Sequence, residues 1–76
     1  MPTNEFREVL RVTRGDETRI YRIRAGSGSP ELWRFLEVDG EETQSIKECD
    51  LANPDEAWTF LEEVQRTLRA GGWRQR

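Results

Sequence analysis

The stretch EFREVLRVTRGDETRIYRIRA, residues 5–25, decides the fold of this 76-residue chain. Apolar side chains alternate with polar ones on both sides of Gly15 and Asp16, and a period of two is typical of half-buried strands. Glycine followed by aspartate favours a short hairpin loop with glycine first, as in a type II′ turn. The stretch therefore predicts an antiparallel hairpin whose strands span residues 5–14 and 18–25.

The register of this hairpin decides which side chains share a face, because opposite residues of paired strands project to the same side. With Gly15 and Asp16 as the loop, the predicted pairs are Arg14–Glu17, Val12–Arg19, Leu10–Tyr21, Glu8–Ile23 and Phe6–Ala25. One face is then apolar and suits a core: Phe6, Leu10, Val12, Tyr21, Ile23 and Ala25. The other face gathers arginines between apolar and hydroxyl side chains: Arg7, Val9, Arg11, Thr13, Thr18, Ile20, Arg22 and Arg24.

Two weaker strands follow the hairpin. Residues 26–30, rich in glycine and serine, predict a flexible connection, and residues 31–39 predict a third strand. Its facing is open, since either its aromatic or its aliphatic side chains can point to the core. The aromatic set is Trp33 and Phe35, and the aliphatic set is Leu32, Leu36 and Val38. Residues 40–42 predict a turn, and residues 43–49 predict a fourth strand.

Residues 53–70 carry the signals of an amphipathic helix. Asn53 can cap the first turn, Pro54 suits the first helical position, and Glu56 completes a capping-box spacing. Apolar side chains recur at helical spacing and predict the face that packs on the sheet: Ala57, Phe60, Leu61, Val64 and Leu68. The glycines at positions 71–72 end the helix.

The element order predicts an α+β fold, namely a four-stranded antiparallel meander (ββββα) with one C-terminal helix packed on one face. The chain is short enough for a single small domain over residues 1–76. Within it we expect a polar leader (1–4), the antiparallel sheet (5–49), the helix (53–70) and a basic tail (71–76). Because one helix covers only one face of a sheet, the other face becomes the candidate functional surface.

The residue inventory argues against catalysis and against a bound metal or cofactor. The chain has no histidine, the commonest general base and metal ligand. Its one cysteine, Cys49, lies between two carboxylates that disfavour a thiolate. The acidic side chains lack the ordered spacing of a calcium loop, and no glycine-rich loop opens a helix. We therefore predict a non-enzymatic protein with no metal, cofactor or small-molecule substrate.

The composition and the N-terminal sequence predict a cytoplasmic protein. A secreted chain of this size usually needs disulfides, and a single cysteine cannot form an internal one. The first residues do not follow a signal-peptide pattern, and no apolar run approaches the ~18 residues of a membrane span. We therefore expect no contact with a membrane.

Charge is distributed unevenly along the chain, whose formal net charge is -3. Eleven of the twelve basic residues are arginine, which favours bidentate and stacked contacts. Residues 1–30 carry an excess of two positive charges, whereas residues 31–53 carry an excess of five negative charges. An exposed face that mixes charged with apolar side chains is typical of an interaction site.

The sequence thus predicts a macromolecule-binding protein whose favoured partner is a protein or a second copy of the chain. The predicted contact residues are Arg7, Val9, Arg11, Ile20, Arg22, Arg24 and Trp58. An alternative acidic surface within residues 37–50 is formed by Glu37, Asp39, Glu41 and Glu42. In this hypothesis the protein is a small inhibitor or adaptor, and a homodimer would join the arginine face to the acidic segment.

Single-stranded nucleic acid is the alternative partner. Arginines would then bind phosphates while Trp33 or Phe35 stacked on bases. The ββββα order is similar to that of sheet-based single-strand binders and of some small phage proteins that inhibit bacterial defence machinery. The second likeness makes a phage-encoded, anti-CRISPR-like inhibitor one form of the predicted function.

Overall fold

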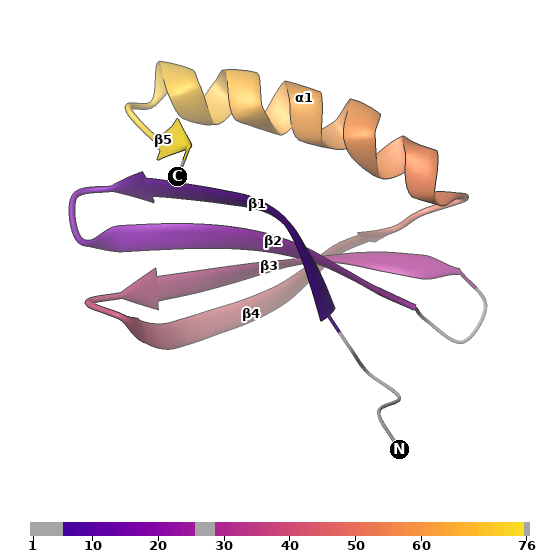
Figure 1. Cartoon of the computed structure of the whole chain (residues 1–76), viewed down its shortest axis with the longest axis horizontal. Coiled ribbons are helices and arrows are strands. Elements are labelled where there is room, and N and C mark those ends of the chain that lie inside the picture. The colour runs from indigo at the N-terminus through magenta and orange to yellow at the C-terminus, as the bar shows by residue number, and fades with distance from the viewer. Residues whose placement is uncertain (1–5, 26–28, 76) are drawn as a thin grey trace.

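The computed structural model describes residues 6–25 and 29–75, which form a five-stranded antiparallel sheet and one helix (Figure 1). The elements are β1 (Phe6–Arg14), β2 (Glu17–Ala25), β3 (Pro30–Val38), β4 (Glu41–Asp50), α1 (Pro54–Ala70) and β5 (Arg74–Gln75). Their order in the sheet is β4-β3-β2-β1-β5. The predicted α+β meander with a C-terminal helix is confirmed, and β5 is an addition to it. The predicted leader (1–4) and most of the predicted connection (26–30) lie outside the described residues.

The β1–β2 hairpin forms at the predicted turn. Arg14 pairs with Glu17 across the loop, and Gly15 has a φ of 62°, whereas the φ of Asp16 is not positive. A positive φ at the first loop position alone fits a type II′ turn, where glycine avoids the strain that a Cβ would cause.

The β3–β4 hairpin turns one residue earlier than predicted. Asp39 and Gly40 have φ values of 55° and 83°, and two positive φ values define a type I′ turn, for which Asp-Gly is a preferred sequence. Val38 therefore pairs with Glu41, and β4 begins at that residue. The turn predicted over residues 40–42 is wrong, because the loop consists of the Asp-Gly pair.

A β-bulge at Val9 changes the register of the N-terminal half of β1. Leu10 pairs with Tyr21 as predicted, but Glu8 then pairs with Arg22, which leaves Val9 without a partner in β2. An extra residue in one strand interrupts the alternation of faces. The predicted pairs Glu8–Ile23 and Phe6–Ala25 are therefore wrong.

The bulge exchanges the faces of the residues that precede it. Phe6 pairs with Arg24, whereas Arg7 pairs with Ile23, which packs against the core beneath the helix. In Figure 1 the N-terminal part of β1 bends across the neighbouring strands, and bulges add such a bend. The bend places Phe6 on the sheet face opposite α1, so its predicted place in the helix-side core is wrong.

The core between α1 and the sheet matches the predicted helix stripe. Asn53 caps α1, since its side-chain oxygen accepts a hydrogen bond from the Glu56 N–H at 3.2 Å. The buried side chains of this core are Leu10, Val12, Tyr21, Leu32, Leu51, Ala57, Leu61, Leu68 and Trp73, with Val9, Ile23, Cys49, Phe60 and Val64 packed against them. Leu32 is part of this core, so the aliphatic side of β3 faces α1. Because side chains alternate along a strand, Trp33 and Phe35 face away from α1.

The end of the chain closes the core. The N–H of Trp73 donates to the carbonyl oxygen of Leu68 at 2.9 Å, and the indole is buried, with 6% of the residue exposed. Residues 74–75 then pair with Val12 and Thr13 as β5. The predicted tail over 71–76 thus contains an edge strand, because the buried indole brings the next residues alongside β1.

Candidate functional site

The sheet face turned away from α1 carries a group of interlocking aromatic and arginine side chains. Paired rows of β2 and β3 supply most of it: Ile20 with Phe35, Arg22 with Trp33, and Arg24 with Glu31. Phe6 joins them from the bent end of β1. We call Phe6, Trp33, Phe35, Arg22 and Arg24 the arginine–aromatic cluster. The only helix of the described residues packs on the other face, so no helix covers this cluster (Figure 1).

The aromatic rings of the cluster pack against one another in well-defined geometries. Phe6 meets Phe35 edge to face, with ring centroids 5.1 Å apart, and meets Trp33 in the same way at 6.0 Å. Phe35 is buried and Ile20 beside it is fully enclosed, whereas Phe6 remains 37% exposed. Edge-to-face aromatic pairs add about 0.5–1.5 kcal/mol beyond their buried area. The open face therefore has a small apolar layer of its own, separate from the helix-side core.

Two guanidinium groups cover the rings of this layer. Arg22 Cζ lies 4.5 Å from the ring centroid of Phe35. Arg24 Cζ lies 4.7 Å from the ring of Trp33 and 5.1 Å from that of Phe6. Arginine stacks readily on aromatic faces, and each such contact contributes about 0.5–2 kcal/mol. The arginines are therefore held in place by the aromatic side chains.

Glu31 fixes the orientation of the cluster. One oxygen of its carboxylate, Oε1, accepts hydrogen bonds from Arg24 Nη2 at 2.8 Å, Arg24 Nε at 3.1 Å and Trp33 Nε1 at 3.0 Å. These hydrogen bonds, with the charges of Arg24 and Lys47, lower the pKa of Glu31, although desolvation opposes them. A carboxylate with several charge-assisted bonds holds its donors in one geometry.

Most arginines of the open face are already paired with acids. Arg11 Nη2 lies 2.8 Å from Glu8 Oε1, and its Nε donates to the other oxygen at 3.1 Å. The hydrogen bond from Arg11 is the main reason why the pKa of Glu8 is lowered. Burial opposes it, and the charges of Arg11 and Arg22 lower the pKa further. The charges of Arg11 and Arg24 are therefore compensated by carboxylates of the same chain. Among the described residues, Arg22 has no carboxylate within 4 Å.

Three of the predicted contact residues lie on the open face: Arg11, Arg22 and Arg24. Three others do not present a surface there. Ile20 is 0% exposed and so cannot touch a partner. Val9 packs against the helix-side core, and Arg7 lies on the face of Ile23, because the bulge reverses the alternation that placed them among the arginines.

Sequence reasoning missed Phe6 and Glu31 as members of the open face. Glu31 points to the same face of β3 as Trp33, and the sequence alone did not decide which face that is. The only local sign of the bulge is that Val9 and Leu10 are consecutive apolar residues, since strict alternation would place one of them in solvent. Both pack against the helix-side core instead.

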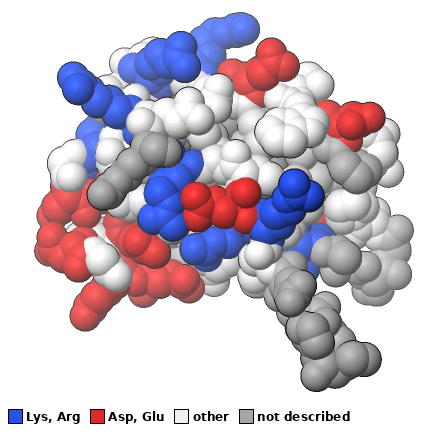
Figure 2. All heavy atoms as spheres, viewed as in Figure 1, with Lys and Arg blue, Asp and Glu red and all other residues white. Residues whose placement is uncertain are grey.

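The remaining predicted residues lie on two other surfaces. Trp58 projects from α1 with 57% of the residue exposed. The acidic residues gather at one end of the molecule, at the lower left of Figure 2, where Figure 1 places the β3–β4 turn. This acidic end consists of Asp16, Glu37, Asp39, Glu41 and Glu42, none of which has a basic group within 4 Å among the described residues. The Asp39 N–H donates to the Asp16 carbonyl at 3.1 Å and so joins the two hairpin turns.

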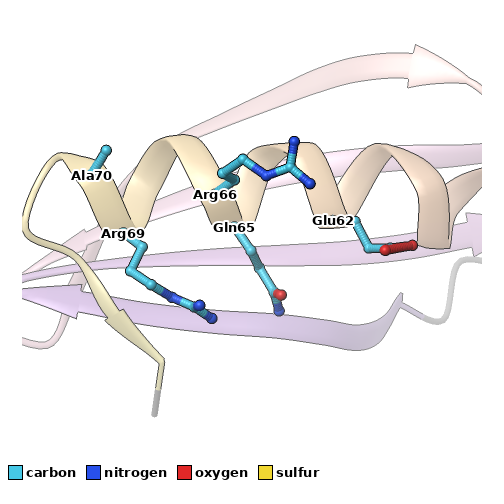
Figure 3. Close-up of a pocket in the computed structure, with 5 residues that line it drawn as sticks. All are labelled: Glu62, Gln65, Arg66, Arg69 and Ala70. Carbon is cyan, nitrogen blue, oxygen red and sulfur yellow. The ribbon is translucent and has the colours of Figure 1, made fainter.

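Metal ligation, membrane insertion and thiol chemistry can each be checked in the described residues. They contain no group of three or more metal-ligating side chains and no helix whose length and hydrophobicity would let it cross a membrane. Burial, and then the charges of Glu48, Asp50 and Glu56, raise the pKa of the Cys49 thiol, so the thiolate is disfavoured. On the outer face of α1 a shallow hollow lies among Glu62, Gln65, Arg66, Arg69 and Ala70. Figure 3 shows these side chains diverging from the helix instead of converging on a ligand.

In comparisons with known proteins, no family model, no curated protein and no solved structure matches this chain. Its function is therefore argued from the geometry of its surfaces.

The lowered pKa of Glu31 predicts a pH dependence of stability. A carboxylate whose pKa is lower in the folded state stabilises the fold above its ordinary pKa, near 4.5, and loses this contribution as the pH falls through the folded value. We expect Glu31→Gln to lower the melting temperature at neutral pH, and this difference from wild type to shrink as the pH falls to about 3. Thermal unfolding followed by circular dichroism measures it, and a difference that stayed constant would show that Glu31 is not stabilised by its charge.

Proposed function

We propose that this chain is a non-enzymatic module that binds another protein through the arginine–aromatic cluster, as a small inhibitor or adaptor. The observation that carries the proposal is that the cluster is pre-organised and lies on the face without a helix. Arginine and tryptophan are enriched among the residues that dominate binding energy at interfaces. Side chains held in place before binding lose little entropy when a partner docks.

The chemistry of the cluster favours a partner surface that is both apolar and acidic. Phe6 is 37% exposed, and Trp33 is half-buried beside it. Arg22 is oriented by Phe35 and has no carboxylate of its own among the described residues. A partner carboxylate would accept a bidentate hydrogen bond from Arg22, the geometry for which guanidinium is suited.

The same contacts favour a protein over single-stranded nucleic acid. Base stacking needs free aromatic faces, but guanidinium groups lie over Phe6, Trp33 and Phe35. Phosphate binding draws on unpaired positive charge, but Arg11 and Arg24 are paired with carboxylates. The acidic end adds repulsion toward a polyanion.

Arg22→Gln tests this proposal with little risk to the fold, because it removes a charge and a stacked group from the surface. We expect the variant to remain folded, with a modestly lower melting temperature because it loses the stacked contact with Phe35. We expect it to lose at least about tenfold in affinity for any protein that the wild type captures from a cell lysate. Arg66→Gln, on the exposed outer face of α1, is the matched control and should bind as the wild type does.

Two results would contradict the proposal. One is equal partner binding by Arg22→Gln and Arg66→Gln, which would place function elsewhere on the surface. The other is binding of oligo-dT or oligo-U at low salt that weakens steeply as salt rises and requires Arg22, since counterion release marks phosphate contacts. Sedimentation of the purified protein identifies a second copy as the partner if the wild type dimerises and Arg22→Gln does not.

A further inference from the structure

A groove of about 290 Å³ lies between α1 and the helix-side face of β2 and β3, on the other side of the sheet from the arginine–aromatic cluster. Phe60, Val64 and Leu68 of α1 line one side of the groove. Arg19 of β2 and Arg34 of β3 line the side formed by the sheet. Its size is at the lower end of the range for small-ligand sites. The groove therefore has room for a small ligand or for the last residue of a peptide.

The sheet side of the groove offers hydrogen-bond donors. Tyr21 is 97% buried, being 3% exposed, and lines the groove. Its hydroxyl makes no hydrogen bond with the described residues. Among the described residues, every fully buried side-chain polar atom has a hydrogen-bond partner, so the Tyr21 hydroxyl, which has none, must keep some exposed surface. Arg34 lies opposite Tyr21 in the neighbouring strand, and its Nε is 3.1 Å from Glu48 Oε1.

Arg19 supplies the strongest unused donor. Its Cζ lies over the ring of Trp73, 4.8 Å from the ring centroid, so the indole helps to hold the side chain in place. Among the described residues, Arg19 has no carboxylate within 4 Å. A guanidinium without a carboxylate partner can donate two parallel N–H bonds, in the arrangement that matches a carboxylate.

The helix side of the groove is apolar in its lower part and acidic at its rim. Phe60 and Val64 are half-buried and pack against the core, so they form an apolar wall. Glu63 of α1 and Glu48 of β4 also border the groove. Two rim carboxylates oppose the entry of a phosphate dianion more strongly than that of a single negative charge.

We propose that this groove binds a monocarboxylate attached to a short apolar group, with the carboxylate on Arg19 and the Tyr21 hydroxyl and the apolar group against Phe60 and Val64. A free carboxylic acid and the C-terminus of a peptide share this chemistry. The proposal does not depend on the function assigned to the open face, because the two sites lie on opposite faces of the sheet.

The test uses N-acetyl-leucine as the probe and two-dimensional NMR of the intact chain as the readout. We expect saturable shifts of the Arg19 side-chain N–H, and of the Thr67 amide on the rim, with a millimolar dissociation constant. N-acetyl-leucinamide, which lacks the charge, should bind at least about tenfold more weakly, because hydrogen bonds to charged groups are stronger than those to neutral groups. Acetyl-Ala-Ala-Leu distinguishes the two sources, since tighter binding than that of N-acetyl-leucine identifies a peptide end.

Tyr21→Phe is the decisive variant, because it keeps the buried ring and removes only the hydroxyl. It should melt as the wild type does and bind N-acetyl-leucine several-fold more weakly. Arg19→Lys keeps the charge but loses the planar donor, and should weaken binding further; Arg66→Gln is the unaffected control. Equal binding of acid and amide, unchanged binding by Tyr21→Phe, or no saturable shift at millimolar N-acetyl-leucine would overturn the proposal.

Discussion

Trp73→Ala is expected to lower the free energy of unfolding by about 3–5 kcal/mol, the usual effect of truncating a buried aromatic side chain. The indole is part of the helix-side core, and 6% of the residue is exposed. Two guanidinium groups pack on its ring, since Arg14 Cζ is 4.7 Å and Arg19 Cζ is 4.8 Å from the ring centroid. Arg14 Nη1 also donates to the Gly71 carbonyl at 3.1 Å, so the variant removes the aromatic ring that helps to hold Arg14 beside the segment leading into β5.

The chain contains a matched control for this substitution. Trp58 is 57% exposed, so Trp58→Ala should change the stability by no more than about 0.5 kcal/mol. Urea unfolding followed by circular dichroism gives both values. If the two tryptophan variants unfolded at the same urea concentration, the C-terminal segment would not be anchored in the core.

Leu61→Ala is expected to cost about 2–5 kcal/mol, because it removes a buried side chain and leaves a cavity. Leu61 is 3% exposed in the centre of the α1 stripe, where it shares the core with Leu10 and Tyr21. A loss of this size is a large share of the stability of so small a domain. Many molecules of the variant would then be unfolded at physiological temperature.

Glu62→Ala controls for the loss of a side chain at the next position of α1. Glu62 is exposed, and alanine is a good helix former, so the stability should change little. Melting curves of the two variants should therefore differ widely. A Leu61→Ala curve that coincided with that of Glu62→Ala would contradict the packing of α1 on the sheet.

The features that could be predicted from the sequence are those that depend on residues close to one another along the chain. The α1 stripe and the Asn53 cap depend on spacings within one helix, and the first hairpin depends on the Gly15 turn. The short strand β5 could not be predicted in this way. The β5 strand spans only Arg74 and Gln75, too few residues for a periodic pattern, and forms because Trp73 is buried.

The candidate site was only partly predictable because one extra residue changes which side chains meet. The arginine face was expected from uninterrupted alternation, which held from Leu10 to the turn but failed at Val9. A bulge is stabilised by tertiary packing, here by the burial of Val9 and Leu10 together. The bulge also places Phe6 on the open face. There Phe6 packs against Trp33, and the Arg24 guanidinium lies over its ring.

Photo-crosslinking in the source cells tests most directly whether the open face binds a protein. A benzoylphenylalanine residue would be placed singly at Phe6 of the cluster, at Trp58 of α1 or at Glu41 of the acidic end, all three of which are exposed. We expect a specific protein adduct from position 6 and none from positions 58 and 41. Adducts from position 58 or 41 without one from position 6 would contradict it.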